Sequence, residues 1–85
     1  MPVCSYVVHP VPGRMHSLTK TLNSMKGCEV TPAKEHELLI LVTETNSPQE
    51  EYALQEKLTH QDDIECLALA FGEIQASPAM EHHHE

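Results

Sequence analysis

The spacing of apolar residues changes several times along this 85-residue chain, and the order of the changes constrains the fold. Residues 3–9 are rich in β-branched and aromatic side chains and end before a turn of Pro and Gly, which is typical of a strand. Four apolar residues then recur at helical intervals on one face, namely Met15, Leu18, Leu22 and Met25. Gly27 follows, where the left-handed end of a helix favours a residue without a Cβ atom. The first third of the chain is therefore predicted to be a strand followed by a helix.

Two further strands are predicted in the middle of the chain. Residues 28–31 form a short extended segment that Pro32 interrupts, and because a proline nitrogen cannot donate to a ladder, we expect this segment at a sheet edge. Residues 38–43 form a continuous apolar run, which is consistent with a central strand. The polar residues 33–37 are predicted to connect the two as a hairpin whose turn type the sequence does not specify.

The strongest local signal is a helix start at residues 47–50. Ser47 is a favoured N-cap residue, Pro48 suits the first helical position, and Glu50 can reach back to the N–H of the cap. We expect this helix to continue to Thr59. Its buried side is predicted to hold Ala53, Leu54 and Leu58, and its solvent side Glu51, Gln55 and Lys57. Residues 64–71 are then predicted to form the last strand.

The predicted order is strand, helix, strand, strand, helix, strand. Elements in this order most economically form a ferredoxin-like βαββαβ sandwich, an α+β fold in which a four-stranded antiparallel sheet carries both helices on one face. We expect this domain to span residues 1–74, and residues 75–85 to form a disordered tail because they lack periodicity. The histidine run 82–84 is typical of an added tag. One face of the sheet is thereby expected to stay open.

Alternation along the last strand separates large from small side chains. The large set, Leu67, Leu69 and Phe71, is expected to pack beneath the helices. The small set consists of Cys66, Ala68, Ala70 and Gly72, and we expect it to line a shallow open face onto which another chain can lie closely. Small residues can also be merely tolerated on an exposed face. In the first strand, composition leaves open which of the two alternating sets is buried.

Charge restricts the partners of the chain. The 13 acidic and 5 basic residues give a net charge of -8, which repels phosphate backbones and attracts cationic partners. Nucleic acid is therefore a poor candidate ligand and a basic peptide a good one, although net negative charge can also serve solubility alone. Because the sequence has neither a run of about 18 apolar residues nor an export signal, we expect a cytoplasmic protein without stable membrane insertion.

Three cysteines and seven histidines could indicate metal binding or thiol chemistry. Outside the terminal histidine run, their spacing contains no Cys-x-x-Cys, no His-x-x-x-His and no zinc-finger separation, so we expect no metal and no cofactor. A nucleophile with its base is conceivable only as Cys4 or Cys66 with His9 on neighbouring strands. The thiols are more simply interpreted as reduced side chains packed as small hydrophobes, and no enzyme activity is expected.

Four segments of the chain carry a resemblance to a known family. They read Val3-Cys4-Ser5-Tyr6-Val7-Val8, Gly27-Cys28-Glu29-Val30, Leu38-Leu39-Ile40-Leu41-Val42 and Leu67-Ala68-Leu69-Ala70-Phe71. Together they resemble the NapD family, the cytoplasmic assembly chaperones of periplasmic nitrate reductase. The similarity runs from about residue 3 to residue 73. Its most specific part is the Cys-Ser pair of the first strand followed by Gly-Cys-Glu-Val after the first helix.

The resemblance implies a function in binding rather than catalysis. Members of the family bind the twin-arginine signal peptide of the nitrate reductase catalytic subunit and delay its export while the molybdenum and iron–sulfur cofactors of that subunit are inserted. A protein similar to this family is expected to be cytoplasmic and to carry no cofactor of its own. We also expect it to be a monomer.

We expect the signal peptide, as a helix, on the open face of the sheet. The residues expected to lie beneath it are Val3, Ser5, Val7, Cys66, Ala68 and Ala70. Carboxylates at the rim are expected to meet its arginines, with Glu44, Glu65 and Glu73 as candidates.

Two other classes of function stay open from the residues alone. Ferredoxin-like domains can dimerise and bind metabolites at strand edges, which predicts a stable dimer and thermal stabilisation by an amino acid or nucleotide. An enzyme predicts turnover that is lost when Cys4 or His9 is changed. A monomer that only a basic peptide stabilises would exclude the metabolite-binding class.

Overall fold

The computed structural model describes residues 2–33 and 36–72. Its elements are, in chain order, β1 (Val3–Pro10), α1 (Met15–Asn23), β2 (Cys28–Pro32), β3 (Leu39–Glu44), α2 (Pro48–Thr59) and β4 (Ile64–Gly72). This is the order that the sequence predicts. The predicted tail, residues 75–85, and the predicted domain boundary at residue 74 lie outside the described residues.

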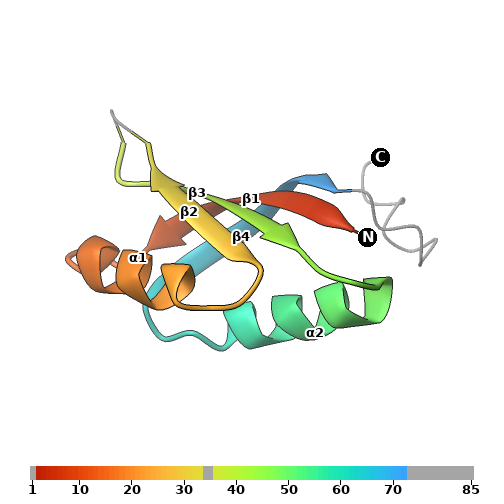
Figure 1. Ribbon diagram of the computed structural model, residues 1–85. Coiled ribbons are helices and arrows are strands. Elements are labelled where there is room, and N and C mark those ends of the chain that lie inside the picture. Colours follow the sequence, from red (N-terminus) through yellow and green to blue (C-terminus); the bar gives the residue numbers. More distant parts are fainter. Residues whose placement is uncertain (1, 34–35, 73–85) are drawn as a thin grey trace.

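The four strands form one antiparallel sheet in the order β2-β3-β1-β4. Both helices lie on the same side of this sheet (Figure 1). The fold is therefore the predicted ferredoxin-like α+β sandwich. β3 is central, and β2, which ends at Pro32, is an edge strand, so both expectations for the middle of the chain are confirmed.

The core lies between the sheet and the two helices. Its buried apolar residues are Cys4, Tyr6, Val8, Leu18, Leu22, Val30, Leu39, Leu41 and Leu58. Side chains alternate along a strand, so the burial of Cys4, Tyr6 and Val8 turns the other residues of β1 to the opposite face. The structure thus decides which set of the first strand is buried, which composition left open.

α2 begins with the predicted N-cap. The Ser47 hydroxyl accepts the N–H of Glu50 at 3.1 Å, and Pro48 occupies the first helical position. The Glu50 carboxylate accepts the N–H of Asn46 at 3.2 Å, so the prediction that it reaches the N–H of Ser47 is wrong by one residue. The Ser47 and Glu50 side chains therefore still accept backbone N–H groups in opposite directions at the start of the helix, as in a capping box.

Replacing Ser47 by alanine is expected to lower the free energy of unfolding by about 1 kcal/mol, because the N–H of Glu50 loses its acceptor. For a domain of this size the melting temperature should fall by about 4–8 °C. Thermal unfolding followed by circular dichroism measures this shift. Gln49→Ala, an exposed change in the same helical turn, is the matched control and should leave the melting temperature nearly unchanged. Equal shifts in both variants would contradict the capping role.

The faces of α2 differ from the prediction at two positions. Glu51, expected to face water, is fully buried, and Ala53, expected to be buried, is exposed. The reason is that Tyr6 and Thr43 of the sheet present hydroxyl groups to Glu51, so a carboxylate can be buried there. Leu58 is buried as predicted.

A β-bulge in β4 changes the predicted alternation of the last strand. Ser5 pairs with Phe71, whereas the next residue of β1, Tyr6, pairs with Leu69, so Ala70 is an extra residue. Paired residues of antiparallel strands share a face of the sheet, and Phe71 therefore lies on the face of Ser5, away from the helices. Phe71 is 58% exposed. The prediction that Phe71 packs beneath the helices is wrong, because the bulge shifts the alternation by one residue.

The same bulge moves Gly72 to the helix side of the sheet. Gly72 pairs with buried Cys4, and a Cβ atom at Gly72 would lie 3.1 Å from the Cys4 Sγ atom. The prediction that Gly72 belongs to the small set on the open face is therefore wrong as well. A second register shift lies between His9 and Pro10 of β1 and leaves Glu65 of β4 as the extra residue.

Candidate functional site

The candidate site is the side of the sheet that faces away from α1 and α2, here called the open face. From β2 to β4 its residues are Glu29, Thr31, Ile40, Val42, Glu44, Val3, Ser5, Val7, His9, Cys66, Ala68, Ala70 and Phe71. The strand register arranges most of them in rows that cross all four strands. One row is Glu29, Val42, Ser5 and Phe71, and the next is Thr31, Ile40, Val7 and Ala68.

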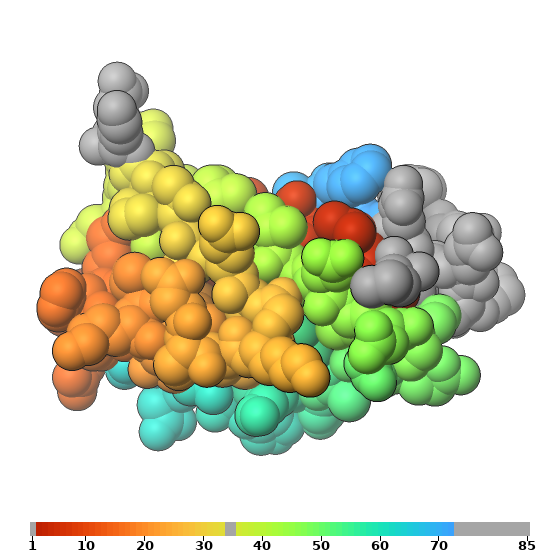
Figure 2. All heavy atoms as spheres, in the orientation of Figure 1, coloured from red at the N-terminus to blue at the C-terminus, as the bar shows by residue number. Residues whose placement is uncertain are grey.

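The middle of the open face is apolar and accessible. Val3, Ile40 and Val42 are each between 37% and 39% exposed, and Phe71 is exposed further. In the view of Figure 2 the end of β4, in blue, stands out at the upper surface beside the red atoms of β1. These side chains are neighbours on adjacent strands, so they form one continuous area rather than scattered contacts. A continuous apolar area of this kind on a small domain indicates an interaction site.

The structure brings most of the expected contact residues together. Val3, Ser5, Val7, Cys66 and Ala68 all lie on the open face. Ala70 is exposed and occupies the bulge beside them.

The expected rim carboxylates lie far from one another. Glu44 pairs with Val3 at the start of β1, whereas Glu65 lies in the bulge near Pro10 at its end. They therefore occupy opposite ends of the sheet and cannot meet the same arginine. Glu73 lies outside the described residues.

Several residues of the open face were not expected from the sequence. Glu29 alternates with the inward residues Cys28 and Val30, so its direction could have been inferred from the burial of Val30. Ile40 and Val42 belong to a continuous apolar run, in which no polar residue marks the outer face. Phe71 depends on a bulge, and nothing in the strand sequence marks the position of that bulge.

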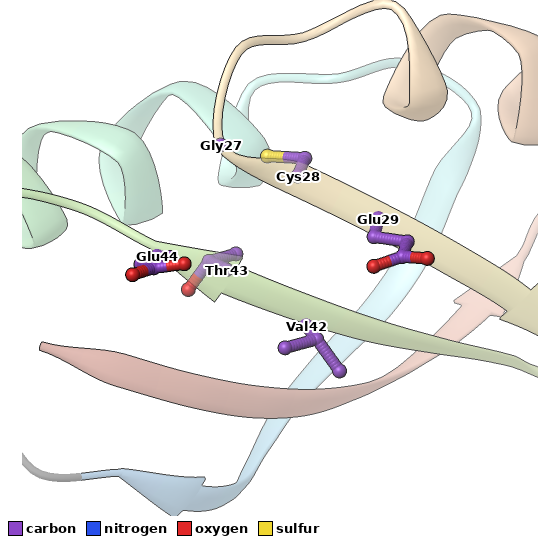
Figure 3. Close-up of a pocket in the computed structure, with 6 residues that line it drawn as sticks. All are labelled: Gly27, Cys28, Glu29, Val42, Thr43 and Glu44. Carbon is purple, nitrogen blue, oxygen red and sulfur yellow. The ribbon is translucent and has the colours of Figure 1, made fainter.

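A shallow cavity of about 260 Å³ lies where β2 begins and β3 ends (Figure 3). It is lined by Gly27, Cys28, Glu29, Val42, Thr43 and Glu44. The two strands approach closely here, because the N–H of Glu44 donates to the carbonyl oxygen of Gly27 at 2.9 Å. A Cβ atom at Gly27 would lie 2.6 Å from the carbonyl oxygen of Glu44, and Gly27 has a φ of 80°. This corner of the sheet therefore requires glycine at position 27.

The charges of the open face are acidic. Glu29 and Glu44 are exposed, and neither forms an ion pair with a described residue. The described basic side chains belong to the helices and to the loops beside α1, and they are Arg14, Lys20, Lys26 and Lys57. Arg14 lies 3.5 Å from Asp63, on another part of the molecule. The electrostatic character of the open face therefore suits a cationic ligand.

A buried hydrogen-bond network supports the open face from below. The hydroxyls of Tyr6 and Thr43 each donate to Glu51 Oε2 at 2.7 Å, and the Thr45 hydroxyl donates to Oε1 at 2.9 Å. Gln55 Nε2 in turn donates to the Tyr6 hydroxyl at 2.8 Å. Burial and the hydrogen bond to Glu51 raise the pKa of Tyr6 above its usual range, so the phenol stays protonated as a donor. The network ties α2 to both central strands and fixes which face of β1 points outward.

The thiols differ in burial, and the exposure of Cys66 agrees with the alternation of the last strand but not with the interpretation of all three thiols as packed. Cys4 is buried and Cys28 is half-buried, but Cys66 is exposed on the open face. Burial, with a smaller contribution from the charge of Glu51, raises the pKa of Cys28 and keeps this thiol protonated.

Of the two conceivable nucleophiles, Cys66 pairs with His9, whereas Cys4 is buried on the opposite face of the sheet. No other described side chain is hydrogen-bonded to His9 or Cys66. Within residues 2–33 and 36–72, no group of three or more His, Cys, Asp or Glu side chains could hold a metal ion. Among the described helices, none is long and apolar enough to cross a membrane.

Solved structures similar to this chain include two that match nearly its whole length. The solution structure of the E. coli Tat proofreading chaperone protein NapD matches with a TM-score of 0.74 and 25% sequence identity, covering 98% of this chain and 93% of that one. The crystal structure of a hypothetical protein from Pyrococcus horikoshii matches with a TM-score of 0.75 and 18% identity over the full length of both chains, which supports the fold alone. No curated protein sequence matches the chain significantly.

The sequence profile of the NapD protein family matches residues 1–83, which is nearly the whole chain. The match includes all six elements of the sandwich and every described residue of the open face. The resemblance that the strand sequences suggested is thus confirmed. The chain belongs to the NapD family.

Proposed function

We propose that this protein is a chaperone that binds the twin-arginine signal peptide of the periplasmic nitrate reductase catalytic subunit. Binding delays export of that subunit until its cofactors have been inserted. The proposal rests on membership of the NapD family and on likeness to a protein described as a Tat proofreading chaperone. In this proposal the protein acts in the cytoplasm as a monomer, is not an enzyme and carries no cofactor.

The observation that carries the proposal is the open face, which the helices of the described chain leave uncovered and which is apolar in the middle and acidic at its corners. Signal peptides combine a positively charged segment with an apolar segment of about 7–15 residues. The apolar segment would pack on Val7, Ile40 and Val42, and the arginines would pair with rim carboxylates. Specific association needs only about 800 Å² buried on each partner, which a helix lying across the sheet can supply.

The contact residues expected from the sequence keep their roles in this proposal. Val3, Ser5, Val7, Cys66, Ala68 and Ala70 would lie beneath the peptide. Glu44 and Glu65 would each be available to a different basic residue, since they lie at opposite ends of the sheet. Glu73 remains a candidate for the same role.

Changing Ala68 to glutamate is expected to weaken binding of a synthetic twin-arginine signal peptide at least about tenfold. Ala68 is exposed and pairs with Val7, so the longer side chain would hold a carboxylate beneath the apolar segment of the peptide. Isothermal titration calorimetry with the leader peptide of a nitrate reductase catalytic subunit measures the effect. Ala70→Glu is a second variant on the same strand and should act in the same direction.

Ala53→Glu is the matched control, because Ala53 is exposed on α2, on the opposite side of the molecule. It adds the same charge and should leave the dissociation constant unchanged. Undiminished binding by both β4 variants would remove the open face as the peptide site. Equal weakening by the α2 variant would show a general effect of charge instead.

A further inference from the structure

Building on the proposed function, we infer that the open face holds its signal peptide in one orientation. The arginines lie at the corner of β2 and β3, against Glu29 and Glu44. The apolar segment crosses β3 and β1 and ends against Phe71 on β4. This assigns roles to Glu29 and Phe71.

A peptide on this face binds as a helix. Between the outer edges of β2 and β4, the backbone groups of the sheet are engaged in strand pairing, so they cannot satisfy the N–H and C=O groups of a chain that lies flat on the face. Leaving those groups without partners on an apolar surface is costly. A helix satisfies its own backbone groups and presents only side chains to the sheet.

The distribution of charge sets the direction of the peptide. Glu29 and Phe71 stand at the two ends of one row, with Val42 and Ser5 between them. Glu44 lies two residues beyond Val42 on β3, so it is the diagonal neighbour of Glu29. Both carboxylates border the corner cavity shown in Figure 3. The opposite end of the row is apolar and ends at the most exposed large hydrophobic residue of the described chain.

The width of the sheet fits the layout of a leader peptide. Strands lie about 4.8 Å apart, so the three steps from Glu29 on β2 to Phe71 on β4 span roughly 14 Å. A helix rises about 1.5 Å per residue and covers that span in about ten residues. An arginine at the β2–β3 corner is thus separated from the residue over Phe71 by about the length of one apolar segment.

The bulge at Ala70 is what makes Phe71 available. If β4 paired with β1 without a bulge, Ser5 would pair with Ala70, and Phe71 would share the helix-side face of Leu69. Bulges often re-aim side chains at functional sites, and aromatic residues are favoured anchors in peptide recognition. Phe71 therefore provides an anchor for the apolar end of the helix.

Double-mutant cycles between protein and peptide test this orientation. The protein variants are Glu29→Gln and Phe71→Ala. The parent peptide is the twin-arginine leader of a nitrate reductase catalytic subunit; one variant peptide has both arginines changed to Gln, and another has the distal half of the apolar segment changed to Ser. Fluorescence anisotropy at fixed salt gives the dissociation constants.

Each protein variant is expected to weaken binding of the parent peptide by about five- to tenfold. Glu29→Gln should have no further effect on the Gln peptide, and Phe71→Ala none on the Ser peptide. The crossed pairs are Glu29→Gln with the Ser peptide and Phe71→Ala with the Gln peptide. In these pairs the losses of affinity from the two changes should multiply, because the changed groups do not touch. Glu56→Gln on α2 and Leu69→Ala on the helix side of β4 are the matched controls and should bind like the parent protein.

The outcomes separate the orientation from the function. Coupling of Glu29 to the apolar end, or of Phe71 to the arginines, would overturn the orientation, and so would equal effects on all three peptides. If Ala68→Glu abolishes binding and the expected couplings are absent, the orientation is overturned and the proposed function is not. No binding of the parent peptide would overturn both proposals. A stable dimer that Ala68→Glu dissociates would show that a second copy, not a peptide, covers the face.

Discussion

Replacing Glu51 by alanine is expected to lower the free energy of unfolding by about 3–5 kcal/mol. The change removes the acceptor of three hydroxyl groups, those of Tyr6, Thr43 and Thr45, and two of these groups are buried. It also leaves space under α2, since Glu51 is itself fully buried. A domain of this length is stabilised by only about 4–13 kcal/mol in total, so a large part of its stability would be lost.

Urea denaturation followed by circular dichroism measures this change. Glu51→Gln, which keeps the shape of the side chain and one acceptor oxygen, should lose distinctly less stability than the alanine variant. Glu56→Ala, an exposed change five residues along the same helix, is the matched control and should be nearly neutral. A midpoint for Glu51→Ala close to that of Glu56→Ala would contradict the role of the network in joining α2 to the sheet.

Replacing Gly27 by alanine is expected to cost about 2–4 kcal/mol of unfolding free energy. A left-handed φ of 80° is strained for alanine, and the new Cβ atom would meet the carbonyl oxygen of Glu44 at 2.6 Å. That oxygen is backbone and cannot turn away. Relief requires β2 and β3 to separate, which weakens the hydrogen bond from the Glu44 N–H to Gly27.

Gly13→Ala separates the cost of the left-handed φ from the cost of the close contact with the Glu44 carbonyl oxygen. Gly13 has a similar φ of 85°, but a Cβ atom there would meet nothing within 4 Å. Gly13→Ala should therefore lower the free energy of unfolding only by the cost of the backbone conformation, about 1–2 kcal/mol. Thermal and urea unfolding of the two variants side by side should show the larger loss for Gly27→Ala. Equal losses would contradict the close approach of the strands at the corner that carries Glu29 and Glu44.

Local signals predicted the elements and their order well. The N-cap hydrogen bond of Ser47 joins it to a residue three positions further on, so the local sequence is enough to predict the start of the helix. Pro32 marked the edge strand for a similarly local reason. With each element identified, the short connections and the alternation of strands and helices left few arrangements besides the ferredoxin-like sandwich.

Features that depend on strand register escaped prediction. The bulge at Ala70 exists in the pairing of β4 with β1 and has no mark in the sequence of β4 itself, so Phe71 was assigned to the wrong face. The burial of Glu51 was missed for a similar reason, because it depends on hydroxyl groups contributed by β1 and β3. Glu29 became a candidate only when pairing placed it across from Val42 and diagonal to Glu44. The open face as a whole and one of its corner carboxylates, Glu44, could be anticipated, but the position of Glu29 diagonal to Glu44 and the aromatic end at Phe71 could not.

Methyl NMR spectra recorded during titration with a twin-arginine signal peptide test the central claim most directly. Outward methyl groups report on the open face, and inward ones on the packing of the helices. We expect the signals of Val7, Ile40 and Val42 to shift, while those of Leu54 and Leu58 beneath α2 stay in place. Shifts concentrated on the helix side, or saturation of binding without any change at these three outward residues, would contradict the account.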